Sequence, residues 1–103
     1  MTAKELDERI LKSAGWRLEP PEDEFSHWIA PNGSVALLEP PIDLPILVAA
    51  MDATFRDWSI RSFVEVSVRK YQPRIGVMYE PVRTDMAEAL REALRGHWEA
   101  GGD

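Results

Sequence analysis

The sequence of 103 residues contains no cysteine, which excludes a disulfide framework, a thiol nucleophile and thiolate metal ligands. It has no apolar run of the roughly 20 residues that a membrane-spanning helix needs. The motifs of the common nucleotide-binding, zinc-protease and serine-hydrolase sites, such as G-x-x-x-x-G-K and H-E-x-x-H, are also missing. These absences favour a cytoplasmic protein that is not an enzyme and has no cofactor, no metal and no membrane contact.

Charge is distributed unevenly along the chain. The net charge is −6, from 18 acidic and 12 basic residues. Residues 1–58 hold 11 acids and 5 bases, residues 59–83 hold 2 acids and 5 bases, and residues 84–103 hold 5 acids and 2 bases. Segment 59–83 is therefore a basic region in an acidic chain. The net acidity argues against nucleic acid as the partner of the whole protein.

Three segments have the apolar spacing and the capping residues of amphipathic helices. We expect helices over about residues 3–14 with Thr2 and Glu5 as a capping box, over about residues 44–57 with Asp43 as the cap, and from Thr84 or Asp85 to about Trp98. The remaining segments have the alternation or the turn residues of strands.

The first hairpin is predicted at residues 25–30 and 34–38, because Asn32-Gly33 between apolar runs is a strong hairpin signal. Its second strand is apolar on both faces, which predicts that both faces are covered. A second hairpin is predicted from residues 60–70 and 74–80, with its turn near Gln72-Pro73. A short strand over residues 16–18 precedes both hairpins.

The two hairpins and the helices that follow them form a pattern that repeats after about 40 residues. We expect one domain over residues 1–103, composed of a helix at 1–15, a hairpin-helix unit at 25–58, a second unit at 59–98 and a tail at 99–103. The predicted fold is a layered α/β sandwich of the α+β type. It has a mostly antiparallel sheet of about four to five strands, three helices on its two faces, and the order α-β-ββ-α-ββ-α.

The polar face of the second hairpin and the basic tip predicted at residues 69–74 form the candidate interface. It combines basic residues with aromatic rings, a composition that suits protein recognition and also phosphate contact and base stacking. The candidate residues are Arg61, Phe63, Glu65, Arg69, Tyr71 and Arg74. Two alternatives remain: a charged edge that prevents sheet aggregation, and a nucleic-acid contact through a basic hairpin tip.

The histidines and one acidic loop offer a further alternative. His27 at a strand end favours a structural role, but it could serve as a general base in a small enzyme. His97 suits the C-terminal end of a helix. The loop at residues 19–24 carries four acids that could bind a hard cation, although it lacks the spacing of a calcium loop, so we expect it to be a solvated loop.

Several short motifs resemble the phage ABA-sandwich domain family of small phage and prophage proteins. They are Ala14-Gly15-Trp16 after the first helix, Pro45-Ile46-Leu47-Val48-Ala49-Ala50-Met51, and Ala87-Glu88-Ala89-Leu90-Arg91-Glu92-Ala93-Leu94. The resemblance implies helices on both faces of a sheet and implies no catalytic residues. The proline-rich acidic loop departs from the family pattern. A second resemblance is to acidic secretion chaperones, which act as dimers.

These observations predict a small non-enzymatic protein-interaction or accessory protein of phage or bacterial origin. The expected partner is another protein, or a second copy of the chain in a homodimer. The alternatives are a dimeric binding module similar to secretion chaperones, a small enzyme that uses His27, and a nucleic-acid contact at the basic hairpin.

Overall fold

The computed structural model describes residues 1–20 and 25–102, which form three helices and two three-stranded antiparallel sheets. The predicted α+β class and its three helices are confirmed. The elements are α1 (Ala3–Ser13), β1 (Arg17–Glu19), β2 (His27–Ile29), β3 (Val35–Ala36), α2 (Leu44–Thr54), β4 (Trp58–Glu65), β5 (Val68–Ile75), β6 (Met78–Tyr79) and α3 (Met86–Glu99).

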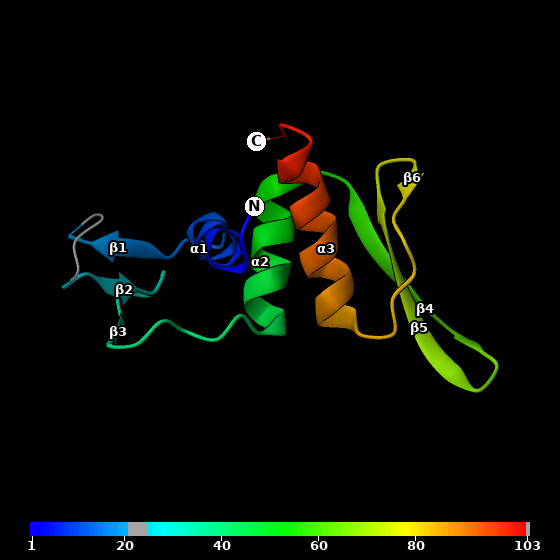
Figure 1. Cartoon of the computed structure of the whole chain (residues 1–103), viewed down its shortest axis with the longest axis horizontal. Coiled ribbons are helices and arrows are strands. Elements are labelled where there is room, and N and C mark those ends of the chain that lie inside the picture. Colours follow the sequence, from blue (N-terminus) through cyan, green and yellow to red (C-terminus); the bar gives the residue numbers. More distant parts are fainter. Residues whose placement is uncertain (21–24, 103) are drawn as a thin grey trace.

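The helices form the central layer, with one sheet at each end of the molecule (Figure 1). Helix α1 packs on α2, α2 packs on α3, and α3 packs on β5. The prediction of a single sheet of four to five strands with helices on both faces is therefore wrong. The strands β1, β2 and β3 pair only with one another, and β4, β5 and β6 do the same in the described residues. The helical layer separates the two sets.

The predicted caps begin all three helices, and this part of the prediction is confirmed. In each case a backbone N–H of the first turn donates to a side-chain oxygen. The bonds are Glu5 N–H to Thr2 Oγ1 (3.1 Å), Ile46 N–H to Asp43 Oδ1 (3.1 Å) and Glu88 N–H to Asp85 Oδ1 (2.9 Å). The cap residues thus specify where each helix starts.

The hydrophobic core lies between the helices. Its buried side chains are Leu6, Ile10, Leu11, Trp28, Ile46, Leu47, Ala50, Met51, Phe55, Leu90, Ala93, Leu94 and Trp98. Only Trp28 in this set comes from a strand. Each sheet adds partly buried side chains at the margin of the core, among them Leu18 and Ala36 at one end and Ile60 and Ile75 at the other. The three helices therefore supply most of the buried apolar surface.

The first sheet is covered on one face only, so the prediction that its second strand is covered on both faces is wrong. Strand β3 has two residues, of which Ala36 lies on the face of Trp28 and packs against the core. The chain then leaves the sheet, and Leu37 and Leu38 are exposed. Val35 projects from the other face of β3 and is 58% exposed, so this face has no covering helix.

The second hairpin turns at Val66-Ser67, so the predicted turn at Gln72-Pro73 is wrong. Both turn residues have positive φ, 50° and 62°. Two-residue hairpin turns of this kind usually contain glycine, asparagine or aspartate, and Val66-Ser67 contains none of them, so no turn is predicted here. Pro73 instead lies within β5, opposite Ile60. A second turn follows at residues 76–77 and adds β6 to the sheet.

Replacing Gly15 with alanine is expected to lower the free energy of unfolding by about 1–2 kcal/mol, the usual cost of a side chain in left-handed backbone. Gly15 has φ +97° at the junction between α1 and the first sheet, and an added Cβ would lie 3.1 Å from Pro31 Cγ. Gly96 is the matched control, because it lies inside α3 with open space around it. Gly96→Ala is expected to raise stability by about 0.5–1 kcal/mol. Urea denaturation measures both, and changes of the same sign would contradict this account.

Candidate functional site

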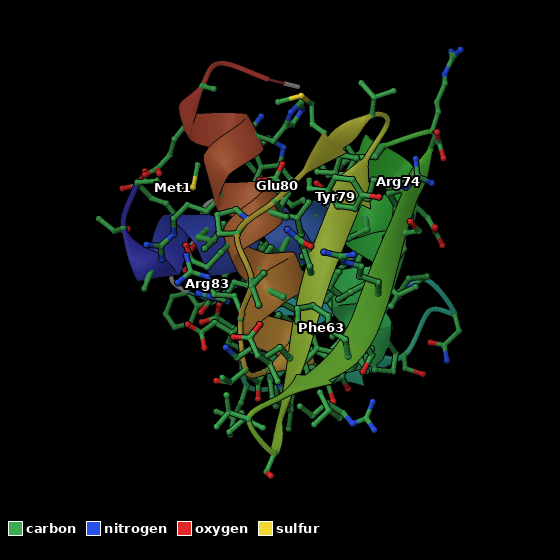
Figure 2. The ribbon with its side chains drawn as sticks, turned by 90° about the vertical axis from the view of Figure 1, so that its right-hand side faces the viewer. Met1, Phe63, Arg74, Tyr79, Glu80 and Arg83 are labelled. Atoms are coloured by element: carbon green, nitrogen blue, oxygen red, sulfur yellow. The ribbon has the colours of Figure 1, made fainter. Side chains whose placement is uncertain are left out.

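The cross-strand register of the second sheet defines its solvent side. Residues directly opposite each other in antiparallel strands project from the same face. Because Trp58, Ile60 and Ile75 pack against the core, the alternate residues project away from the helices. We call this surface the outer face; it comprises Ser59, Arg61, Phe63, Glu65, Val68, Lys70, Gln72, Arg74 and Tyr79. Figure 2 shows this end of the molecule.

Arg61 contacts two aromatic rings of the outer face. Its guanidinium carbon lies 5.1 Å from the ring centroid of Phe63 and 5.2 Å from that of Tyr79. Both distances are within the range of cation–π attraction, which contributes about 0.5–1 kcal/mol per contact at an exposed site. Phe63 is half-buried, while Tyr79 is 58% exposed. The guanidinium is thus oriented on a surface that a partner can reach.

Gln72 connects Arg61 to β6 and its exit. Arg61 Nε donates to Gln72 Oε1 at 2.8 Å, and Gln72 Nε2 donates to the carbonyl oxygen of Glu80 at 2.9 Å. These two hydrogen bonds join β4 to β5 and β5 to the residue that follows β6. They fix the plane of the Arg61 guanidinium and leave its terminal amino groups for further hydrogen bonds.

The other charged groups of the outer face form cross-strand pairs. Lys70 Nζ lies 2.9 Å from Glu65 Oε1. Arg74 donates from Nε to Ser59 Oγ at 3.2 Å and lies 3.6 Å from Asp57 Oδ1. These pairs are exposed, so each contributes little to stability. Each pair offsets one positive charge with a carboxylate, and Arg61 has no such carboxylate partner among the described residues.

Two of the predicted interface residues, Arg69 and Tyr71, lie on the opposite face, so the prediction that they share one surface with Arg61 and Phe63 is wrong. Arg69 donates to Ser62 Oγ at 2.7 Å, and the backbone of Tyr71 pairs with that of Arg83. The turn at residues 66–67 is the reason, because it moves the second strand of the hairpin and changes which residues share a face. The predicted basic tip is also wrong, since the end of the hairpin carries exposed valines.

The sequence prediction placed Arg61, Phe63 and Glu65 on the polar side of the hairpin and Arg74 at its tip, and the structure brings these four together on the outer face. It missed Lys70, Gln72 and Tyr79. The pairing register of β4 with β5 would have identified these residues, because a turn at residues 66–67 places Gln72 opposite Arg61. The register could not be predicted because the turn contains no glycine, asparagine, aspartate or proline.

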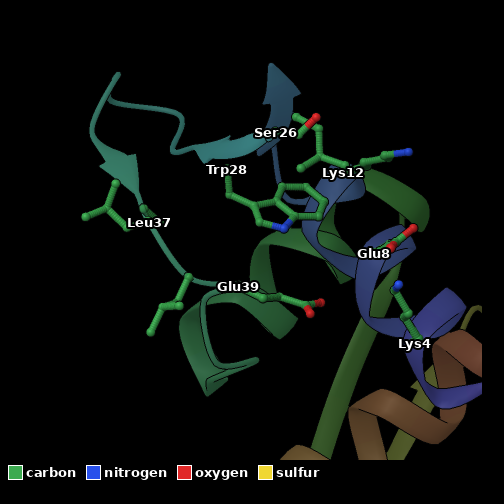
Figure 3. A pocket seen from close by; sticks show the side chains of 10 residues that line it. Lys4, Glu8, Lys12, Ser26, Trp28, Leu37 and Glu39 are labelled. Carbon is green, nitrogen blue, oxygen red and sulfur yellow. The ribbon is translucent and has the colours of Figure 1, made fainter. Parts of the chain in front are cut away.

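A cavity of about 500 Å³ lies between α1 and the first sheet (Figure 3). The indole of Trp28 lies on one side, and Lys4, Glu8 and Lys12 of α1 lie on the other. The residues that line it are Lys4, Glu8, Lys12, Leu18, Ser26, Trp28, Ala36, Leu37, Leu38 and Glu39. Lysines and carboxylates alternate around its rim, as on an ordinary solvated helix surface, and they form no nucleophile-base arrangement.

The histidines lie apart from this cavity and from the outer face. His27 is exposed on β2, opposite Glu19, on the other side of the sheet from Trp28. His97 contacts Phe55 edge to face, with the ring centroids 4.8 Å apart. Of the acidic loop predicted at residues 19–24, Glu19 lies instead at the end of β1, and residues 21–24 lie outside the described residues. Within the described residues, no group of three or more potential ligands is placed to hold a metal ion.

The fold and the outer face define a small α+β protein with one sheet at each end of a helical layer. In residues 1–20 and 25–102 no helix is long and apolar enough to cross a membrane. Comparison with protein-family models, with curated proteins and with solved structures found no match. The resemblance to the phage ABA-sandwich domain family therefore stays a prediction.

Proposed function

We propose that this chain is a non-enzymatic interaction protein, an accessory factor of phage or bacterial origin, which binds an acidic protein partner through the outer face. The observation that carries this proposal is the placement of Arg61 against Phe63 and Tyr79 on an exposed sheet surface. Arginine and tyrosine are enriched among the residues that dominate binding energies. A side chain that is already oriented loses less entropy when a partner binds.

The charge distribution supports an acidic partner. The outer face carries Arg61, Lys70 and Arg74 against Glu65, whereas the segments on either side of residues 59–83 are acidic. This contrast steers an acidic surface towards the second sheet and away from the rest of the molecule. Nucleic acid has weaker support, because Arg69 and Tyr71 lie on the other face and no longer add to one continuous basic strip.

The proposal is tested by comparing the same charge reversal on the two faces of the hairpin. Arg61→Glu is expected to reduce capture of the partner roughly 30-fold, the effect of losing a dominant interface residue. Arg69→Glu is the matched control and should leave capture within about threefold. Quantitative mass spectrometry after affinity capture, with the lysate treated with nuclease, measures both amounts.

Phe63→Ser provides a second variant that keeps every charge, and it should also lower capture. The proposal fails if Arg61→Glu and Arg69→Glu behave alike while both variants retain the circular dichroism of the parent protein. Capture that disappears after nuclease treatment would favour the nucleic-acid alternative instead.

A further inference from the structure

Strand β4 is a long, unprotected edge strand. The order β4-β5-β6 leaves one side of its eight residues unpaired within the described residues. The other edge strands, β1, β3 and β6, have three, two and two residues. Proteins usually protect long edges with lysine, proline or a bulge, because free N–H and C=O groups pair with other strands. From Ile60 to Val64 there is no lysine or proline, and the register with β5 is continuous.

The hydrogen bonds of β5 show which backbone groups of β4 point outward. Tyr71 donates its N–H to the Arg83 carbonyl (2.7 Å) and accepts from the Arg83 N–H (2.9 Å), so both of its groups point away from β4. Ser62 lies directly opposite Tyr71. In an antiparallel pair the two residues of such a position both turn their backbone groups outward. The N–H and C=O of Ser62, and by alternation those of Ile60 and Val64, therefore point to the free edge.

We propose that a second copy of this chain pairs antiparallel with β4, about a two-fold axis that passes through Phe63. This register places Arg61 opposite Glu65 of the second copy, and the symmetry forms the same charge pair twice. It also places Ser62 opposite Val64 of the second copy. Both residues of that pair have outward-facing backbone groups, so the pair is hydrogen-bonded. The edge is thus complementary to itself in charge and in backbone pattern.

Exposed apolar side chains at the end of the hairpin fit the same arrangement. Val66 is 90% exposed, and Val64 is also exposed. Pairing about Phe63 places Val64 opposite Ser62 of the second copy and brings the turn at Val66 close to the start of that copy's β4, which removes apolar surface of both valines from water. The end of the hairpin extends beyond the helices, which leaves its edge accessible (Figure 1).

The paired sheet would have six strands and would present two outer faces side by side. One consequence rests on the proposed function: the two outer faces would bind an acidic partner at two points, which increases avidity. Strand pairing itself does not cover the outer face, because the added strands lie beside the sheet. The interface is small, so we expect a monomer–dimer equilibrium that depends on concentration.

Ser62→Pro tests the pairing at the backbone. Proline removes an N–H that points outward, so the hairpin keeps its backbone hydrogen bonds and loses one side-chain bond, from Arg69 to Ser62 Oγ. The outer-face side chains of Arg61 and Phe63 remain. Loss of this N–H at both symmetric positions is expected to raise the dimer dissociation constant about tenfold or more. Analytical ultracentrifugation over a concentration series measures this constant, and circular dichroism checks the fold. A parent protein that stays monomeric at every concentration would overturn the proposal.

Two charge reversals test the register independently. Arg61→Glu alone places two glutamates opposite each other, and Glu65→Arg alone places two arginines opposite each other, so each variant should dimerise about tenfold less tightly. An equal mixture of the two variants restores both charge pairs and should form a heterodimer with near-parental affinity, detectable by native mass spectrometry. Single variants that dimerise like the parent, or a mixture that does not recover, would overturn the pairing about Phe63.

These results are separable from those of the partner experiment. Ser62→Pro should weaken dimerisation about tenfold or more, while one copy still captures the acidic partner with reduced avidity. If Phe63→Ser leaves capture unchanged but Ser62→Pro dissociates the dimer, the proposed function fails and the pairing stands. If Ser62→Pro leaves the dimer intact, the pairing fails whatever the result of capture.

Discussion

Replacing Leu94 with alanine is expected to lower the free energy of unfolding by about 2–5 kcal/mol. Leu94 of α3 is 0% exposed and belongs to the core cluster to which all three helices contribute. Removing its side chain leaves a cavity that rigid neighbouring helices close only in part. Domains of this size are stable by about 5–15 kcal/mol, so the loss is a large fraction of the total. Urea denaturation followed by tryptophan fluorescence measures the change.

Leu38→Ala is the matched control, because it removes the same atoms from a side chain that is 83% exposed. Its expected effect is within about 0.5 kcal/mol. The comparison also tests the one-sided first sheet: if residues 37 and 38 were covered by a helix, as their sequence pattern predicted, Leu38→Ala would cost as much as Leu94→Ala. Equal losses from the two variants would therefore contradict the exposure of this segment.

The helices were the most predictable part of the fold. Their caps involve residues three positions apart, such as Asp43 and Ile46, and their buried faces follow from spacing within one element. Both signals are local, so the sequence alone contains them. The separation of the strands into two sheets is not local. It depends on which strands meet after the helices pack, and a hairpin pattern is the same whether its sheet stands alone or joins another.

The candidate site was only partly predictable, because it depends on the position of the hairpin turn between β4 and β5. Side chains alternate between the two faces of a strand, so the faces of β5 depend on where the chain reverses. Val66 at φ 50° is unusual for a β-branched residue, and propensity therefore argued against a turn at that position. Arg61 and Phe63 precede the turn and were assigned to the correct face. Arg69 follows the turn and was assigned to the wrong face, and Tyr71 was placed at a tip that lies elsewhere.

Cross-strand contacts accompany this unusual turn. Lys70 pairs with Glu65, and Arg69 bonds to Ser62, on opposite faces of the hairpin. Interactions of this type contribute only a few tenths of a kcal/mol each. Eight consecutive residue pairs join β4 to β5, however, and their sum outweighs the local preference against the turn. The interactions between β4 and β5 thus determine the position of the turn, and the turn determines the face on which each candidate residue of β5 lies.

Trp28→Ala is expected to detach the first sheet from the helices and to cost about 3–5 kcal/mol of unfolding free energy. Trp28 is 6% exposed and is the one strand residue among the described residues of the core cluster. Strands of three, three and two residues do not form a stable sheet alone. Their order therefore depends on the contact of this indole with the helical layer.

The effect should be local as well as large, because the second sheet joins the opposite side of the helical layer. Hydrogen exchange measured by mass spectrometry should show loss of amide protection in residues 17–36, while β4 and β5 keep theirs. His27→Ala changes an exposed neighbour on the same strand and should stay within about 0.5 kcal/mol of the parent. Equal loss of protection in both sheets would mean that Trp28 supports the whole core. Unchanged protection in residues 17–36 would mean that other contacts hold the first sheet in place.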